Sequence, residues 1–130
     1  MTDDPYAQLA SRGDDGWERV MALPRIPSTE PGTFVDLTRK LVFGDLWQRP
    51  HLNVRDRRLV TLTVLALFGR DDITSFHVGA ALRSGDLGPE ELEELGVQLA
   101  FYGGWPVAAA FTTLVAQEVA TWRAAPTADD

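Results

Sequence analysis

Helical patterns follow one another between residues 32 and 125, and glycine separates most of them. Apolar residues at Phe34, Leu37, Leu41 and Val42 recur with the 3.6-residue period of a helix that buries one face. Glycines stand where a C-terminal cap is expected after the next three patterns: Gly69, Gly85 and Gly103-Gly104. No convincing strand alternation occurs. The sequence predicts an all-α protein, a compact antiparallel domain of about six helices joined by short turns.

Capping chemistry marks several helix boundaries. Asn53 is placed to cap a helix over residues 54–68, because its side-chain oxygen can accept a backbone N–H of the first turn. We expect Asp71 or Asp72 to cap the following helix. Pro106 suits the first turn of a last helix that runs to about residue 123.

Composition divides the 130 residues into three parts. Residues 1–31 are polar and rich in glycine and proline, which predicts a short helix near residues 12–21 followed by an extended connector. Residues 32–125 form the helical domain, and residues 126–130 are expected to be a disordered tail.

Charge and cysteine content exclude several classes of protein. The net charge of −7 argues against nucleic acid, whose phosphates need a cationic face. With no cysteine and two histidines, disulfides, thiol redox chemistry, a metal site and a bound cofactor are not expected. The N-terminus has neither the basic start nor the apolar stretch of a signal peptide. No run reaches the roughly 18 apolar residues of a membrane span, so we expect a cytoplasmic protein without membrane contact.

The segment 107–119 is apolar over more than one face. A monomer of this size has little interior in which such a helix could be surrounded completely. Surplus apolar surface favours contact between subunits, and a fully central helix is the alternative. We therefore expect a homo-oligomer.

His77 is the first candidate for chemistry. Ile73, Ala80 and Ala81 share its helical face, so the side chain is predicted to point inward among small apolar groups. An imidazole titrates near neutrality and can donate or accept a proton there. Burial would lower its pKa and a nearby carboxylate would raise it. A core histidine with one hydrogen bond is the alternative reading.

Arginines gather in one stretch of this acidic chain. They are Arg49, Arg55, Arg57, Arg58 and Arg70. The planar fork of a guanidinium donates two parallel hydrogen bonds to a carboxylate, which makes Arg49, Arg55 and Arg58 candidates for binding an acidic substrate. Solvated charge at helix ends is the alternative.

Two further pairs could contribute to a site. Gln98 and Tyr102 share a helical face and both offer groups that donate and accept hydrogen bonds. Trp47 and Trp105 each lie beside a turn and could line a pocket, although core or interface positions are the alternative.

Several of these residues fall into motifs whose order and spacing are familiar. The motifs are Trp47-Gln48-Arg49-Pro50, Arg55-Asp56-Arg57, His77, Gly88-Pro89-Glu90-Glu91 and Tyr102-Gly103-Gly104-Trp105-Pro106. Together they resemble the carboxymuconolactone decarboxylase family over roughly residues 31–119. The resemblance implies an all-helical alkyl hydroperoxidase D-like fold and assembly as trimers or hexamers. It also implies decarboxylation of 4-carboxymuconolactone to an enol-lactone.

The thiol-peroxidase branch of that superfamily uses a glutamate, a Cys-x-x-Cys pair and a histidine. Transferred to this chain, those positions fall on Arg58, on Arg70 and Ile73, and on His77. Only the histidine is retained, so the chain lacks the thiols that peroxidase chemistry needs.

The first functional hypothesis is a cofactor-independent decarboxylase, or related lyase, acting on a small acidic lactone. Arg49 or Arg55 would anchor a substrate carboxylate, and Gln98 or Tyr102 would donate to the lactone oxygen. His77 would protonate the carbanion that remains. The alternatives are a non-catalytic small-ligand-binding or assembly protein on the same fold, and a tailoring enzyme for another carbonyl compound.

Overall fold

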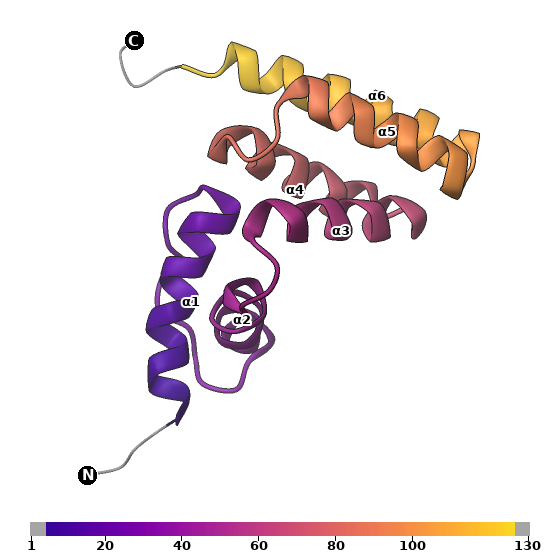
Figure 1. Ribbon diagram of the computed structural model, residues 1–130. Helices are drawn as coiled ribbons and strands as arrows, with labels where there is room; N and C mark the ends of the chain where they lie inside the picture. The colour runs from indigo at the N-terminus through magenta and orange to yellow at the C-terminus, as the bar shows by residue number, and fades with distance from the viewer. Residues whose placement is uncertain (1–4, 127–130) are drawn as a thin grey trace. The chain divides into compact units, whose positions relative to one another are not determined.

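The computed structural model describes residues 5–126, and within that range it contains helices and no strand (Figure 1). In chain order the elements are α1 (Pro5–Met21), α2 (Phe34–Leu37), the π-helical turn η1 (Thr38–Phe43), the 3-10 turn η2 (Leu46–Gln48), α3 (Val54–Leu67), α4 (Asp71–Ser84), α5 (Pro89–Gly103) and α6 (Trp105–Ala124). The all-α class is therefore confirmed. Apart from its first residue, the predicted tail at 126–130 lies outside the described residues.

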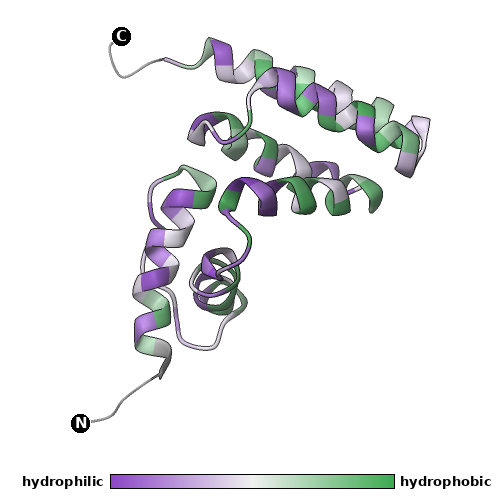
Figure 2. Ribbon diagram, in the orientation of Figure 1, coloured by the Kyte–Doolittle hydropathy of each residue, from purple (hydrophilic) through white to green (hydrophobic). Residues whose placement is uncertain are grey.

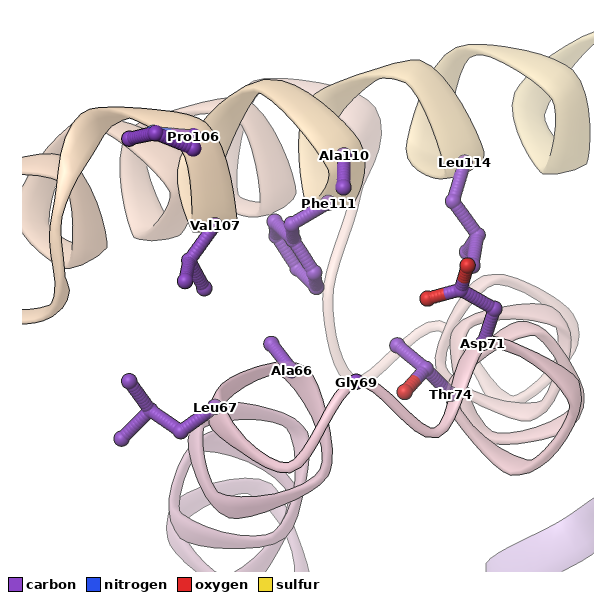
Figure 3. A pocket seen from close by; sticks show the side chains of 10 residues that line it. All are labelled: Ala66, Leu67, Gly69, Asp71, Thr74, Pro106, Val107, Ala110, Phe111 and Leu114. Atoms are coloured by element: carbon purple, nitrogen blue, oxygen red, sulfur yellow. The ribbon is translucent and has the colours of Figure 1, made fainter.

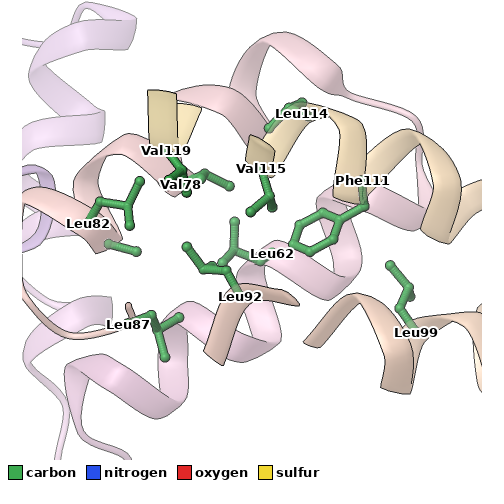
Figure 4. Packing of buried hydrophobic residues seen from close by; sticks show 11 residues of the cluster. Leu62, Val78, Leu82, Leu87, Leu92, Leu99, Phe111, Leu114, Val115 and Val119 are labelled. Atoms are coloured by element: carbon green, nitrogen blue, oxygen red, sulfur yellow. The ribbon is translucent and has the colours of Figure 1, made fainter. Parts of the chain in front are cut away.

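The chain divides into two units, Met1–Arg57 and Arg58–Asp130, with the boundary inside α3. In the C-terminal unit, the core is formed by buried leucines, valines, one phenylalanine and one alanine from α3 to α6 (Figure 4). Leu62 of α3 and Leu92 of α5 are fully buried in it, with Phe111 and Val115 of α6. No helix of the described residues is long and apolar enough to span a membrane.

Most predicted helix ends are confirmed. The backbone N–H of Asp56 donates to the side-chain oxygen of Asn53 at 2.8 Å, as expected for a cap. Gly85 ends α4 with a positive φ of 78°, a conformation that glycine adopts without strain. The expected cap by Asp71 or Asp72 is wrong: Arg70 is the N-cap residue of α4. Both aspartates instead lie in the first turn of α4, where their charge suits the helix dipole.

The first helix is longer than predicted: it ends at Met21 as expected but begins at Pro5 instead of near residue 12, and Gly13 and Gly16 lie inside it. A Cβ atom at Gly13 would overlap the carbonyl oxygen of Arg39, and one at Gly16 would overlap that of Phe43. Both glycines therefore allow α1 to approach η1 closely. The same contact is fixed by Arg39, whose Nε and second guanidinium nitrogen donate to the two carboxylate oxygens of Asp14, each at 2.7 Å.

Replacing Gly16 with alanine should destabilise the N-terminal unit. The added methyl group has no space against the Phe43 carbonyl, and overpacking of this kind costs about 1–3 kcal/mol. Thermal unfolding followed by circular dichroism would measure the loss. Ser11→Ala, an exposed position on the same helix, is the matched control and should change stability little. Equal melting temperatures for the two variants would contradict the close approach.

The segment 107–119 does not form a fully central helix. Ala108, Phe111, Leu114, Val115 and Val119 are buried on one face of α6. On the opposite face Ala109, Ala110 and Ala116 are exposed. The alternative of a helix surrounded on all sides is therefore wrong, and α6 leaves an apolar face of small residues uncovered within the protomer.

Candidate functional site

A buried ion pair lies beneath the turn that joins α4 to α5. Arg58, on α3, is only 1% exposed, and its Nε donates to Oδ2 of Asp86 at 2.8 Å. The hydroxyl of Ser84 donates to the same oxygen at 3.2 Å. Asp86 directly follows Gly85, whose left-handed backbone turns the chain at the end of α4. Sequence reasoning missed Asp86, because nothing local marks it as the partner of an arginine 28 positions earlier.

His77 lies on α4 and is partly buried, with its Nδ1 atom shielded from solvent. Burial, and to a smaller extent the positive charge of Arg58, lower the pKa of His77 from 6.5 to about 4. Burial disfavours the imidazolium because a charge loses its hydration there, and a nearby cation disfavours it by repulsion. His77 is therefore neutral at neutral pH, and the structure brings two of the predicted residues, Arg58 and His77, into electrostatic contact.

Three other predicted residues lie on the surface of the C-terminal unit. Tyr102 is 89% exposed and Trp105 is 69% exposed, and Gln98 is exposed as well. Leu99 of the same helix is buried, so the face of α5 that carries Gln98 and Tyr102 turns away from the core. In the protomer all three side chains face solvent.

The remaining predicted residues belong to the N-terminal unit. Trp47 is 5% exposed and lines a cavity of about 200 Å³ together with Gly16, Val20 and Gln48. Arg49 and Arg55 are exposed, and a guanidinium nitrogen of Arg55 lies 3.8 Å from a carboxylate oxygen of Asp56. Trp47 thus lines a pocket, whereas the two arginines extend into solvent.

A cavity of about 300 Å³ in the C-terminal unit was not anticipated (Figure 3). It opens between α6, which contributes Val107, Ala110 and Phe111, and the connection from α3 to α4. Asp71 and Thr74 are the polar side chains of its lining. The α6 side chains that line it have the spacing of ordinary helix packing, so the sequence alone did not reveal it. His77 is not part of the lining.

Within residues 5–126, no group of three histidine, aspartate or glutamate side chains is arranged to hold a metal ion.

Fold and site together define a cysteine-free, all-α protein in which a buried arginine lies near a neutral histidine. The sequence profile of the carboxymuconolactone decarboxylase family matches residues 33–118, and this chain belongs to that family. It is 34% identical over 73 residues to 4-carboxymuconolactone decarboxylase from Acinetobacter baylyi (strain ATCC 33305 / BD413 / ADP1). That match covers 56% of this chain and 54% of the relative, so the chain spans about half the length of the relative. The resemblance drawn from the motifs is confirmed.

Proposed function

We propose that this chain is a cofactor-independent decarboxylase, or a related lyase, that acts on a small acidic lactone such as 4-carboxymuconolactone. The supporting observation is the partly buried His77 near Arg58, in a chain of the carboxymuconolactone decarboxylase family. Loss of carbon dioxide leaves an electron pair on carbon, and a proton must reach that carbon. His77 is the titratable group of the C-terminal unit best suited to deliver it.

The low pKa of His77 determines the order of the proposed steps. His77 is neutral before the substrate binds, so it must take up the proton that it later donates after binding. A substrate carboxylate placed beside the imidazole would raise its pKa and favour uptake of one proton. When the C–C bond to the carboxylate breaks, the electron pair moves into the unsaturated lactone and carbon dioxide leaves. The imidazolium then protonates the carbon and returns to the neutral form.

Other predicted residues keep their proposed roles on the basis of their chemistry. Arg49 or Arg55 would anchor a second carboxylate of the substrate, since each guanidinium is exposed and can donate two parallel hydrogen bonds. Gln98 or Tyr102 would donate to the lactone oxygen as negative charge develops on it. Arg58, which was expected to bind the substrate, already binds Asp86, so we assign it a different role: together with burial, the larger cause, its charge keeps His77 neutral until the substrate arrives.

The decisive experiment mixes the purified protein with 4-carboxymuconolactone and follows release of carbon dioxide. His77→Asn should lower kcat/KM by about 100-fold or more, the typical contribution of a positioned acid or base. His51→Asn is the matched control: it removes the other histidine, which is exposed and has a positive φ that asparagine tolerates. Turnover that survives His77→Asn in a folded protein would refute His77 as the acid.

A binding protein without turnover is the second candidate. Two cavities run along α6, of about 300 and 620 Å³, and His77 lines neither of them. A thermal shift on addition of the lactone, with no carbon dioxide released, would favour this candidate over the decarboxylase. The proposed homo-oligomer and the cytoplasmic location stay predictions under either function.

A further inference from the structure

We infer that the cavity between α6 and the connection from α3 to α4 binds a small organic cation, an apolar amine whose ammonium group pairs with Asp71. This site lies apart from the proposed chemistry, because His77 does not line it and an acidic lactone carries the opposite charge. The inference therefore stands or fails independently of the proposed function.

The cavity has the size and the walls of a site for a small apolar body. Its volume is about 300 Å³, and an apolar cavity of roughly 150 Å³ is large enough to bind benzene. Figure 3 shows Ala66 of α3 opposite Val107 and Phe111 of α6. The last turns of α3, which contribute Ala66 and Leu67, are hydrophobic in Figure 2. A ring with a short side chain fits this space.

Asp71 brings a negative charge to this apolar lining. Figure 3 shows its carboxylate beside Leu114 and directed toward α6. Arg70, the neighbouring cation, pairs with Asp72 instead, at 3.3 Å. Among residues 5–126, Asp71 has no ion pair, and no lysine or arginine lines the cavity. The cavity thus offers an unpaired carboxylate to a cationic ligand.

The N-terminus of α4 does not reverse this charge. A helix N-terminus carries about half an elementary positive charge, which by itself favours an anion. The first turn of α4 contains both Asp71 and Asp72, and Arg70 compensates Asp72. The full negative charge of Asp71 exceeds the partial positive charge of the helix end, so the local field favours a cation.

The polar side chains of the cavity offer hydrogen-bond acceptors. The hydroxyl of Thr74 already donates to the backbone oxygen of Arg70 at 2.6 Å. Its lone pairs remain as acceptors, like those of the Asp71 carboxylate. An ammonium group has three donors and no acceptor, so it matches this set, whereas a ligand carboxylate would meet acceptor side chains.

A second cavity, of about 620 Å³, adjoins the first and extends the site along α6. The two linings share Asp71, Ala110 and Leu114. Thr113 and Gln117 are among the polar side chains of the larger cavity. Because Asp71 belongs to both linings, an amine that pairs with it can place its apolar body in the smaller cavity and extend a polar group into the larger one.

Three probes of nearly the same shape test the sign of the charge: 2-phenylethylamine, 2-phenylethanol and 3-phenylpropionate. Titration of the ¹⁵N-labelled protein, followed by amide chemical shifts, locates each probe and gives its Kd. The amine should bind about two- to five-fold more tightly than the alcohol, which is the usual effect of an exposed ion pair, and the propionate more weakly than the alcohol. Equal affinities for the three probes, or shifts confined to residues outside 66–74 and 107–114, would overturn the inference.

A charge variant assigns the preference to Asp71. Asp71→Asn should bind the amine and the alcohol equally, with the Kd of the alcohol unchanged. Glu93→Gln, at an exposed position of α5 outside both linings, removes the same charge and is the matched control that should keep the preference. A preference for the amine that survives in Asp71→Asn would refute the assignment.

A steric variant tests the place of the apolar body. Ala110→Leu puts a larger side chain into both linings and should weaken the binding of all three probes. Ala116→Leu, at an exposed position of α6 outside both linings, should bind them like the wild type. Unchanged binding in Ala110→Leu would also overturn the inference. None of these measurements depends on turnover, so the proposed function can fail separately.

Discussion

Replacing Asp86 with alanine should destabilise the protein by about 3–5 kcal/mol, the usual cost of removing one partner of a buried ion pair. The cost arises because Arg58 is 1% exposed and keeps its charge, while its Nε loses the carboxylate oxygen 2.8 Å away. A guanidinium cannot escape by deprotonation within the pH range in which proteins are stable. Urea unfolding of wild type and Asp86→Ala at pH 7, followed by circular dichroism, would measure the difference.

Two controls separate this burial effect from loss of charge alone. Asp72→Ala removes an aspartate that pairs with Arg70 at 3.3 Å, but both side chains are more than half exposed. Exposed pairs of this kind contribute at most about 1 kcal/mol. Adding Arg58→Met to Asp86→Ala should recover most of the lost stability, because an apolar side chain leaves no buried charge. A double variant no more stable than Asp86→Ala would show that the ion pair is not the cause.

The stability of the wild type should also fall between pH 6.5 and about 4, and His77 should contribute a defined part of that fall. The folded state binds the His77 proton only near pH 4, whereas the unfolded chain binds it near 6.5. The contribution is therefore complete above pH 6.5 and is lost as the pH falls through that window. At 1.36 kcal/mol for each pKa unit, the loss is about 3 kcal/mol.

Urea unfolding at a series of pH values would measure this contribution of His77. Between pH 6.5 and 4, the free energy of unfolding should fall less steeply for His77→Asn than for the wild type. His51→Asn, at the exposed histidine, should show the same fall as the wild type. The carboxyls of Asp14 and Asp36 have lowered pKa values because Arg39 and Lys40 bind them, and they also lose stabilisation in acid. They are present in all three proteins, so their effect cancels in the comparison. Parallel slopes for wild type and His77→Asn would contradict the low pKa.

Local chemistry explains which parts of the fold could be predicted. The helices after residue 53 were predicted nearly correctly, because local interactions determine where they begin and end. The side chain of Asn53 caps the start of α3, and the left-handed backbone of Gly85 ends α4. The extent of α1 could not be predicted in this way. The reason for Gly13 and Gly16 inside this helix appears only when the approach of η1 is known, since the space they leave is filled by residues far along the chain.

The candidate site was predictable in its residue types and less so in its arrangement. His77 was expected inside, but the direction of its pKa depended on Arg58 and on burial, neither of which spacing reveals. Gln98 and Tyr102 were expected to share a face, yet a helix that is apolar on several sides does not show which side faces solvent. In the protomer, the side of α5 that carries Leu99 faces the core.

The buried ion pair between Asp86 and Arg58 depends on the number of residues in the turn from α4 to α5. Gly85 reverses the backbone, Asp86 reaches Arg58, and Leu87 is fully buried, all within consecutive positions. One inserted residue would withdraw the carboxylate and the leucine together. Arg58 would then lose its ion pair with Asp86, and its charge would repel a proton on His77 more strongly. Insertions and deletions in this turn would thus act as electrostatic mutations, although they change no charged residue.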